Sequence, residues 1–166
     1  MIEITNAVLY ADFEIIESLV RQILHKFYDP VIPKEHTKYF INKYQTAKAI
    51  EQQVENGSNY FLLKYKGLNV GYLALNKTSD FLLLDKLYLL EDYRGKKIGK
   101  KAIEFTDSFA RKMNISRIEL IVHKENLKTI EFYKKMEFKL LDIVPNHFET
   151  GQIIENYQMA KILATK

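Results

Sequence analysis

The chain has no cysteine, only 3 prolines and 6 glycines, and no apolar run close to the length that crosses a bilayer. Without cysteine it can form no disulfide, no cysteine-ligated zinc site and no thiol nucleophile, which fits a reducing compartment. A membrane-spanning helix needs about 20 apolar residues. Its first residues, Met1 to Ile4, carry an acid where a secretory leader carries basic residues. We therefore expect a cytoplasmic protein with no membrane partner.

Charge and chain length narrow the class of protein further. The 25 basic and 21 acidic side chains leave a net charge of +4, and 47% of the residues are hydrophobic. Because basic and acidic residues are interleaved, the sequence suits an anionic ligand but predicts no nucleic-acid partner. The length of 166 residues predicts one domain, residues 1–166. The histidines lack metal-ligand spacing, so we expect no metal site and interpret them as structural: His25, His36, His123 and His147.

Hydrophobic periodicity predicts helices in the first third of the chain and mainly strands after it. The first three expected helices cover Phe13–Phe27, Pro33–Tyr44 and Ala47–Glu55, and Asn56-Gly57 is expected to cap the third. A fourth helix is expected to bury the face made by Ile98, Ala102, Phe105, Phe109 and Met113. A fifth is expected from Asn126 to Met136. The expected strands cover residues 60–65, 70–75, 81–90 (buried on both faces), 118–122, 138–144 and 156–162. This order predicts an α+β fold, with a mixed, mostly antiparallel sheet of about six to seven strands flanked by helices.

A basic loop follows the expected strand over residues 81–90. It consists of Arg94, Gly95, Lys96, Lys97, Ile98 and Gly99. The start of a helix leaves backbone N–H groups unpaired and its dipole favours negative charge, so the loop suits a pyrophosphate. Neither the P-loop nor the dinucleotide-binding fingerprint fits the glycine spacing. The alternative interpretation is a basic, solvated helix start.

Two stretches carry a resemblance to a known family. Leu87–Lys100 resembles the strand-plus-loop motif of the GNAT superfamily, in which [Q/R]-x-x-G-x-[G/A] binds the pyrophosphate of coenzyme A. Glu125–Phe138 is similar to the family's N-x-x-A-x-x-F-Y-x-k-x-G-F segment. Lys97 and Glu137 replace glycines of the two motifs, so we expect that not every loop amide reaches the pyrophosphate and that the turn at Glu137 bends in another way. The resemblance covers roughly residues 60–161 and implies the GNAT fold.

The resemblance also implies roles for individual residues. The backbone around Leu89 would polarise the thioester carbonyl, Tyr133 would donate a proton to the coenzyme A sulfur, and Asn126 would contact the pantetheine or 3′-AMP portion. Each side chain has a structural alternative: Tyr133 as a core residue and Asn126 as a helix N-cap. The cofactor-binding residues implied are Leu87, Tyr88, Leu89, Arg94, Gly95, Lys96, Lys97, Ile98, Gly99, Lys100, Asn126 and Tyr133.

We favour Asp85 as the catalytic base. It is the only acid within an otherwise apolar strand, and alternation places it on the same face as Leu87 and Leu89. A buried carboxylate is costly unless it has a catalytic role or a partner of opposite charge. Histone and arylalkylamine acetyltransferases, which belong to the family that the two motifs resemble, have the residue that acts as catalytic base on this face of the strand. The alternatives are an ion pair to Lys86 or another lysine, and a water chain in place of a base. His123, at a strand end near the cofactor side, could touch substrate.

The implied reaction is transfer of an acetyl group from acetyl-CoA, a co-substrate used without metal, to a primary amine by direct attack in a ternary complex. The aromatic segment from Phe27 to Tyr44 would form a lip over the acceptor, or pack in the core. Aromatic faces with Asp29 or Glu35 suit a cationic amine such as a polyamine, and the layout is faintly similar to bacterial spermidine/spermine N-acetyltransferases. The alternatives are an acyl-CoA sensor without turnover and a protein or peptide N-acetyltransferase. The oligomeric state stays open, a homodimer included.

Overall fold

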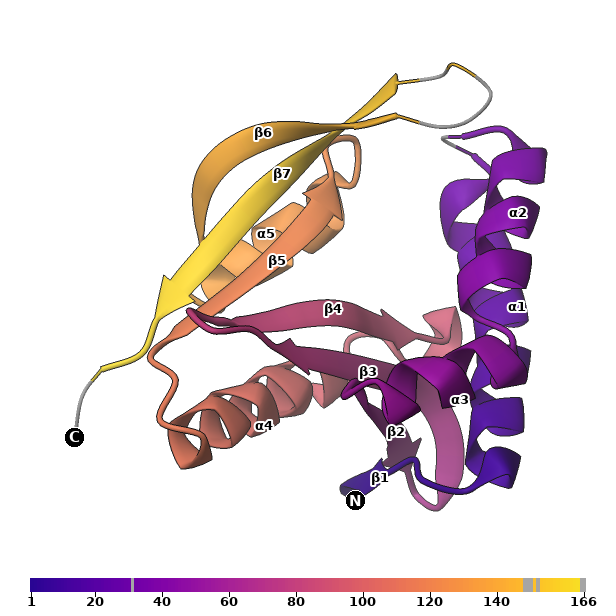
Figure 1. The fold of residues 1–166 in the computed structure, drawn as a ribbon, viewed down its shortest axis with the longest axis horizontal. Helices are drawn as coiled ribbons and strands as arrows, with labels where there is room; N and C mark the ends of the chain where they lie inside the picture. The colour runs from indigo at the N-terminus through magenta and orange to yellow at the C-terminus, as the bar shows by residue number, and fades with distance from the viewer. Residues whose placement is uncertain (31, 148–150, 152, 165–166) are drawn as a thin grey trace. The chain divides into compact units, whose positions relative to one another are not determined.

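The computed structural model describes residues 1–166 apart from 31, 148–150, 152 and 165–166. Seven strands in the described part form a sheet of order β1-β2-β3-β4-β5-β7-β6 (Figure 1). The mixed sheet and the order of helices and strands confirm the predicted α+β fold class. The chain divides into two compact units, the first made of Met1–Asn76 and Lys86–Ala102 and the second of Lys77–Asp85 and Ile103–Lys166.

The first unit has three helices and an antiparallel set of strands. Its elements are β1 (Ile2–Asn6), α1 (Tyr10–Tyr28), α2 (Lys34–Tyr44), α3 (Ala47–Glu55), β2 (Asn59–Tyr65) and β3 (Leu68–Lys77). The three expected helices and the two expected strands over residues 60–65 and 70–75 are confirmed, and α3 has the predicted bounds. β1 was not predicted; it pairs antiparallel with β2, with Ile4 opposite Leu63.

The apolar stripe of α1 forms the core of the first unit with β2 and β3. Ile16, Val20 and Leu24 of the helix are fully buried, as is Tyr72 of β3. Amphipathic helices gain most of their stability by burying such a stripe. One buried amide, Gln45, joins the hydroxyl groups of Tyr60 and Tyr72, with bonds of 2.9 and 2.8 Å, so this polar group is satisfied inside the core.

β4 (Leu82–Leu89) contributes residues to both units. Its first residues pair in parallel with β5, with Leu82 opposite Ile118. The expectation that this strand is buried on both faces is wrong, because only Leu82 and Leu84 are buried and the other residues are half-buried. The strand leads into a short 3-10 turn, Glu91–Tyr93, and then into α4 (Ile98–Lys112). α4 ends before Met113, which is exposed and does not continue the predicted apolar face.

The second unit contains β5 (Arg117–His123), α5 (Leu127–Lys135), β6 (Lys139–His147) and β7 (Ile153–Ile162), with β7 antiparallel to both β5 and β6 (Figure 1). A buried ion pair of 2.8 Å joins Lys161 to Asp107 of α4. β6 lies at the edge, and nearly all its side chains are exposed. No helix in the described residues is long and apolar enough to cross a membrane.

Candidate functional site

The second half of β4 packs its alternate side chains against the core of the first unit. The Tyr88 ring lies 5.7 Å from Tyr72, and its hydroxyl group is 3.0 Å from the hydroxyl group of Tyr28. Burial raises the pKa of Tyr28, and the hydrogen bond to Tyr88 acts in the opposite direction. Strand alternation places Leu87 on the other face. The side chain of Tyr88 is therefore used in packing.

The main chain of β4 is held unusually close to β3 at Gly71. A Cβ atom at this glycine would collide with the carbonyl oxygen of Tyr88 and come within 2.7 Å of Cδ2 of Leu89. One residue further on, the Leu90 N–H donates to the carbonyl of Val70 at 2.8 Å. The strand segment around Leu89, where we expect the thioester carbonyl to be polarised, is thus fixed by backbone contacts that require a glycine opposite it.

The loop between β4 and α4 is exposed but fixed at both ends. The backbone N–H of Arg94 donates to the backbone carbonyl of Glu91 at 3.2 Å. Ile98, the first residue of α4, is only 1% exposed. The residues between them, with Lys100 of the helix, are exposed. Gly95 has φ 76° and Lys97 has φ 65°, so both adopt the left-handed conformation that favours glycine. Lys97 therefore has a backbone conformation that glycine adopts more readily than lysine.

Two cations of this loop rest on aromatic rings of neighbouring elements. The Arg94 guanidinium lies 5.4 Å from the centroid of the Phe27 ring, and the Lys96 ammonium lies 5.8 Å from that of Tyr65. Tyr65 in turn meets Tyr93 edge to face, with centroids 6.1 Å apart. Cation–π contacts of this kind are worth about 0.5–1 kcal/mol at exposed sites, so they can be exchanged for a stronger anionic partner.

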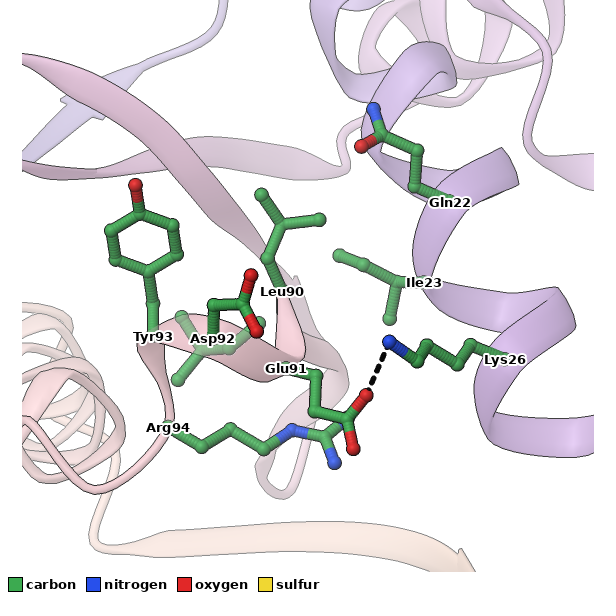
Figure 2. A pocket seen from close by; sticks show the side chains of 9 residues that line it. Gln22, Ile23, Lys26, Leu90, Glu91, Asp92, Tyr93 and Arg94 are labelled. Carbon is green, nitrogen blue, oxygen red and sulfur yellow. Dashed lines mark ion pairs between the residues drawn. The ribbon is translucent and has the colours of Figure 1, made fainter.

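A small pocket of about 210 Å³ lies beside the loop within the first unit (Figure 2). An ion pair of 2.5 Å between Lys26 of α1 and Glu91 crosses it, and the hydrogen bond to Glu91 raises the pKa of Lys26. Its lining also includes the predicted cofactor residues Leu89 and Arg94. The remaining lining residues are Gln22, Ile23, Leu90, Asp92 and Tyr93. Sequence reasoning missed the α1 residues, because nothing in their pattern separates them from any exposed helix face.

The predicted base, Asp85, belongs to the part of β4 in the second unit. Its side chain is half-buried rather than buried, so the expectation of a buried carboxylate is wrong. Its role as a base remains a prediction.

Tyr133 and Asn126 lie on α5 and at its N-cap position. Tyr133 is 5% exposed, and its ring meets Phe138 edge to face at 5.5 Å. Asn126 is half-buried, and in the described part of the chain its side chain does not cap the helix. Asn126 thus has the N-cap position of its structural alternative without a cap hydrogen bond from its side chain, and Tyr133 is packed as a core residue.

Glu137 follows α5 in the left-handed conformation, with φ 74°. Its backbone N–H donates to the carbonyl of Lys134, and the backbone N–H of Phe138 donates to the carbonyl of Tyr133, both at 3.0 Å. These two bonds form the Schellman motif of a helix end. The expectation that this turn bends in another way is wrong. Glutamate takes up the conformation of the glycine that it replaces.

His123 ends β5 next to this helix. Its Nδ1 accepts the N–H of Glu125 at 3.0 Å, which a neutral imidazole protonated on Nε2 can do. Burial lowers the pKa of His123, and the charge of Glu125 acts in the opposite direction. Of the other histidines, His25 pairs with Asp29 at 3.1 Å. Within the described residues no three His, Asp or Glu side chains gather as a metal site would require.

The sequence profile of the acetyltransferase (GNAT) family matches residues 20–138. The chain belongs to the GNAT family. As a member it is an acetyl-CoA-dependent N-acetyltransferase, and the GNAT fold predicted from the two motifs is confirmed. The spermidine N(1)-acetyltransferase of Thermoplasma acidophilum is 27% identical over 136 residues, which cover 79% of this chain and 84% of that protein.

Solved structures of GNAT proteins share the fold. The crystal structure of the PaiA N-acetyltransferase from Thermoplasma acidophilum in complex with coenzyme A has a TM-score of 0.82 at 22% identity, covering 98% of this chain and 99% of that one. The ribosomal-protein-S18-alanine N-acetyltransferase from Escherichia coli has a TM-score of 0.75 at 15% identity, covering 100% and 96%. Proteins that share this fold thus carry names with quite different acceptors, so the fold does not identify the acceptor here.

Proposed function

We propose that the enzyme transfers the acetyl group of acetyl-CoA directly to a primary amine of a small molecule within a ternary complex. The observation that supports this most is the exposed loop from Arg94 to Lys97, fixed between β4 and the buried Ile98. Its left-handed Lys97 keeps the backbone that the family obtains from glycine. Backbone N–H groups at the start of α4, with the helix dipole and the loop cations, would bind the coenzyme A pyrophosphate.

The acceptor amine must lose a proton before it attacks. An ordinary alkylamine has a pKa near 10.4, so the neutral form costs about 4–5 kcal/mol at pH 7. A base that takes this proton as the N–C bond forms offsets part of that cost. Asp85 on β4 is our candidate, since it lies two residues before Leu87 on the strand that would carry the thioester.

The thioester carbonyl needs a donor where negative charge develops. We assign this to the main chain near Leu89, because preorganised backbone N–H groups cost no rearrangement during the reaction. The close approach of Gly71 and the hydrogen bond between Leu90 and Val70 keep that strand segment rigid. The same rigidity would let Leu87 and Leu89 line the pantetheine arm.

The departing thiolate leaves more readily if it is protonated. Tyr133 is the proposed acid, and its packing against Phe138 would limit the orientations of its hydroxyl group. Asn126, whose side chain is not used as a helix cap in the described structure, would hydrogen-bond the pantetheine or 3′-AMP portion.

The acceptor is proposed to be a small amine, and two observations favour different kinds. The spermidine N(1)-acetyltransferase at 27% identity supports a polyamine. The segment from Phe27 to Tyr44 contains more lysines than acidic residues. This charge favours an acceptor amine that carries less positive charge than a polyamine.

Release of free coenzyme A thiol is the direct test. The purified protein with acetyl-CoA should release thiol when a panel of polyamines, amino acids, aminoglycosides and peptides is added, and only with some of them. Tyr133→Phe keeps the ring packed on Phe138 and removes only the hydroxyl group, so turnover should fall roughly a hundredfold while coenzyme A affinity stays the same. Tyr157→Phe, which removes a hydroxyl group elsewhere in the second unit, is the matched control and should retain activity.

Two results would contradict the proposal in different ways. Calorimetry that detects no binding of acetyl-CoA or free coenzyme A would remove the cofactor assignment. Tight coenzyme A binding with no thiol release for any amine would instead favour the sensor without turnover. Full activity in Tyr133→Phe would be compatible with the proposed reaction but would show that Tyr133 is not its general acid.

A further inference from the structure

The aromatic rings of the segment from Phe27 to Tyr44 already hold cations of the chain itself. The Lys86 ammonium lies 5.6 Å from the centroid of the Phe40 ring. Lys43 lies 5.3 Å from the ring of Tyr44. A cationic acceptor would find these ring faces taken, so the structure does not provide the open aromatic surface that the sequence suggested.

The charges of the segment point the same way. Between residues 27 and 44 there are three lysines and two acidic residues, and Lys86, which meets Phe40 of this segment, adds a further cation. One of the two acids, Asp29, is paired with His25 at 3.1 Å. Repulsion from the half-buried Lys86, which is less screened than that from the exposed lysines, would disfavour a polyamine with two or three charges.

Lys86 is the cation best placed to meet an acceptor. It lies on β4 directly before Leu87, and alternation puts it on the same face as Tyr88, whose ring packs toward α1. It is half-buried, so its ammonium is less screened than a fully exposed one. The contact with Phe40 joins it to α2. Lys86 thus stands on the helix side of the strand that, in the proposed function, carries the thioester on Leu87 and Leu89.

We propose that the acceptor is a primary amine on a molecule that also carries an anionic oxygen group, a carboxylate or a phosphate, and that Lys86 binds this group. The inference rests on the proposed function. The amine nitrogen forms a bond to the acetyl carbon, the bond from that carbon to sulfur breaks, and the proton lost by the amine balances the one gained by the thiolate. Lys86 takes no part in these steps; it sets which amines are held beside β4.

The test uses acceptors of one chain length that differ only at the far end: an α,ω-diamine, the corresponding amino alcohol, the amino carboxylate and the amino phosphate. Wild-type protein should acetylate at least one of the two anionic acceptors with a kcat/KM at least tenfold above that of the diamine, with the alcohol between them. The better of the two identifies the anion. Spermidine belongs in the same series and should be poorer still.

Variants separate Lys86 from general charge effects. Lys86→Glu should reverse the order, so that the diamine exceeds both anionic acceptors, and Lys86→Gln should bring all the acceptors close together. Lys48→Gln removes an exposed lysine of α3, outside the segment from Phe27 to Tyr44, and should leave the order unchanged. Because the coenzyme site does not include Lys86, the affinity for coenzyme A should stay constant in all three variants.

Several outcomes would overturn the inference without touching the proposed function. A wild-type enzyme that prefers the diamine or spermidine contradicts it, and so does an anion preference that Lys86→Glu leaves intact. Calorimetric binding of the same acceptors to protein saturated with free coenzyme A gives the ranking without turnover. Absence of binding by either anionic acceptor overturns the inference too. Failure of acetyl-CoA itself to bind is the separate result that removes the proposed function.

Discussion

The ends of α3 and α5 have the same hydrogen bonds but different residues at the left-handed position. After α3, Gly57 has φ 104° and the N–H of Ser58 donates back into the last turn at 2.9 Å. After α5, Glu137 has φ 74° and the N–H of Phe138 donates to Tyr133 at 3.0 Å. Both are Schellman motifs. One is built on glycine, which adopts this conformation freely, and the other on a residue for which it costs about 1–2 kcal/mol.

The residue after the left-handed position explains the difference. Phe138 is 2% exposed and its ring packs on Tyr133, whereas Ser58 at the same position of α3 has no ring to pack. Strained backbone persists only where the surroundings over-determine it. At α5 the packed aromatic pair fixes the turn, so a glutamate is tolerated. At α3 the turn depends on the glycine itself.

Removing the aromatic pair should have the largest effect. Phe138→Ala deletes a buried ring that contacts Tyr133 and lies 5.9 Å from the Lys161 ammonium, and such changes cost about 3–5 kcal/mol. Urea unfolding followed by circular dichroism measures the loss. Ser58→Ala is the corresponding control at α3 and should change stability by less than about 0.5 kcal/mol. A loss below about 1 kcal/mol in Phe138→Ala would mean that the pair does not fix the turn.

Placing glutamate at the α3 end should have a smaller effect of the same sign. A Cβ atom at Gly57 meets nothing within 4 Å, so Gly57→Glu adds no collision and its cost comes from the backbone alone. The left-handed conformation costs about 1–2 kcal/mol, and the backbone entropy that glycine loses on folding offsets part of it, so we expect a loss of about 1 kcal/mol in the same unfolding experiment. Gly57→Asn should cost less, because asparagine visits this conformation more readily. Equal losses for the two variants would contradict the conformational explanation.

Local patterns were enough for most elements of the fold. The Ala47–Glu55 helix has a threonine cap whose hydroxyl accepts the N–H of Ala49, and Gly57 ends it, so both of its limits are written in the sequence. β1 escaped prediction because five residues that gain their stability by pairing with β2 carry little periodicity of their own. The half-burial of β4 depends on neighbouring elements, which a run of apolar residues does not reveal.

The candidate site was predictable where it follows from a motif and not where it follows from packing. The order of residues from Leu87 to Gly99 indicated the loop and the family. The same motif suggested that Lys97 would change the loop, since sequence rules reserve left-handed positions for glycine. The contact of Lys86 with Phe40 joins residues far apart in the sequence, and no local pattern indicates it. The position of Lys86 beside this part of α2 therefore became visible only with the fold.

Restoring glycine at the α5 end should have the smallest effect and the opposite sign. Glu137→Gly removes the left-handed strain, but glycine loses more backbone entropy on folding, so we expect a gain of roughly 0.5–1 kcal/mol. Asn114, which ends α4 in the same motif with φ 58°, is the matched control, and Asn114→Gly should gain less because asparagine is less strained there. Since Glu137 is exposed and Phe138 keeps Tyr133 packed, thiol release by Glu137→Gly should equal that of the wild type. A loss of stability in Glu137→Gly would show that the glutamate side chain itself stabilises the turn.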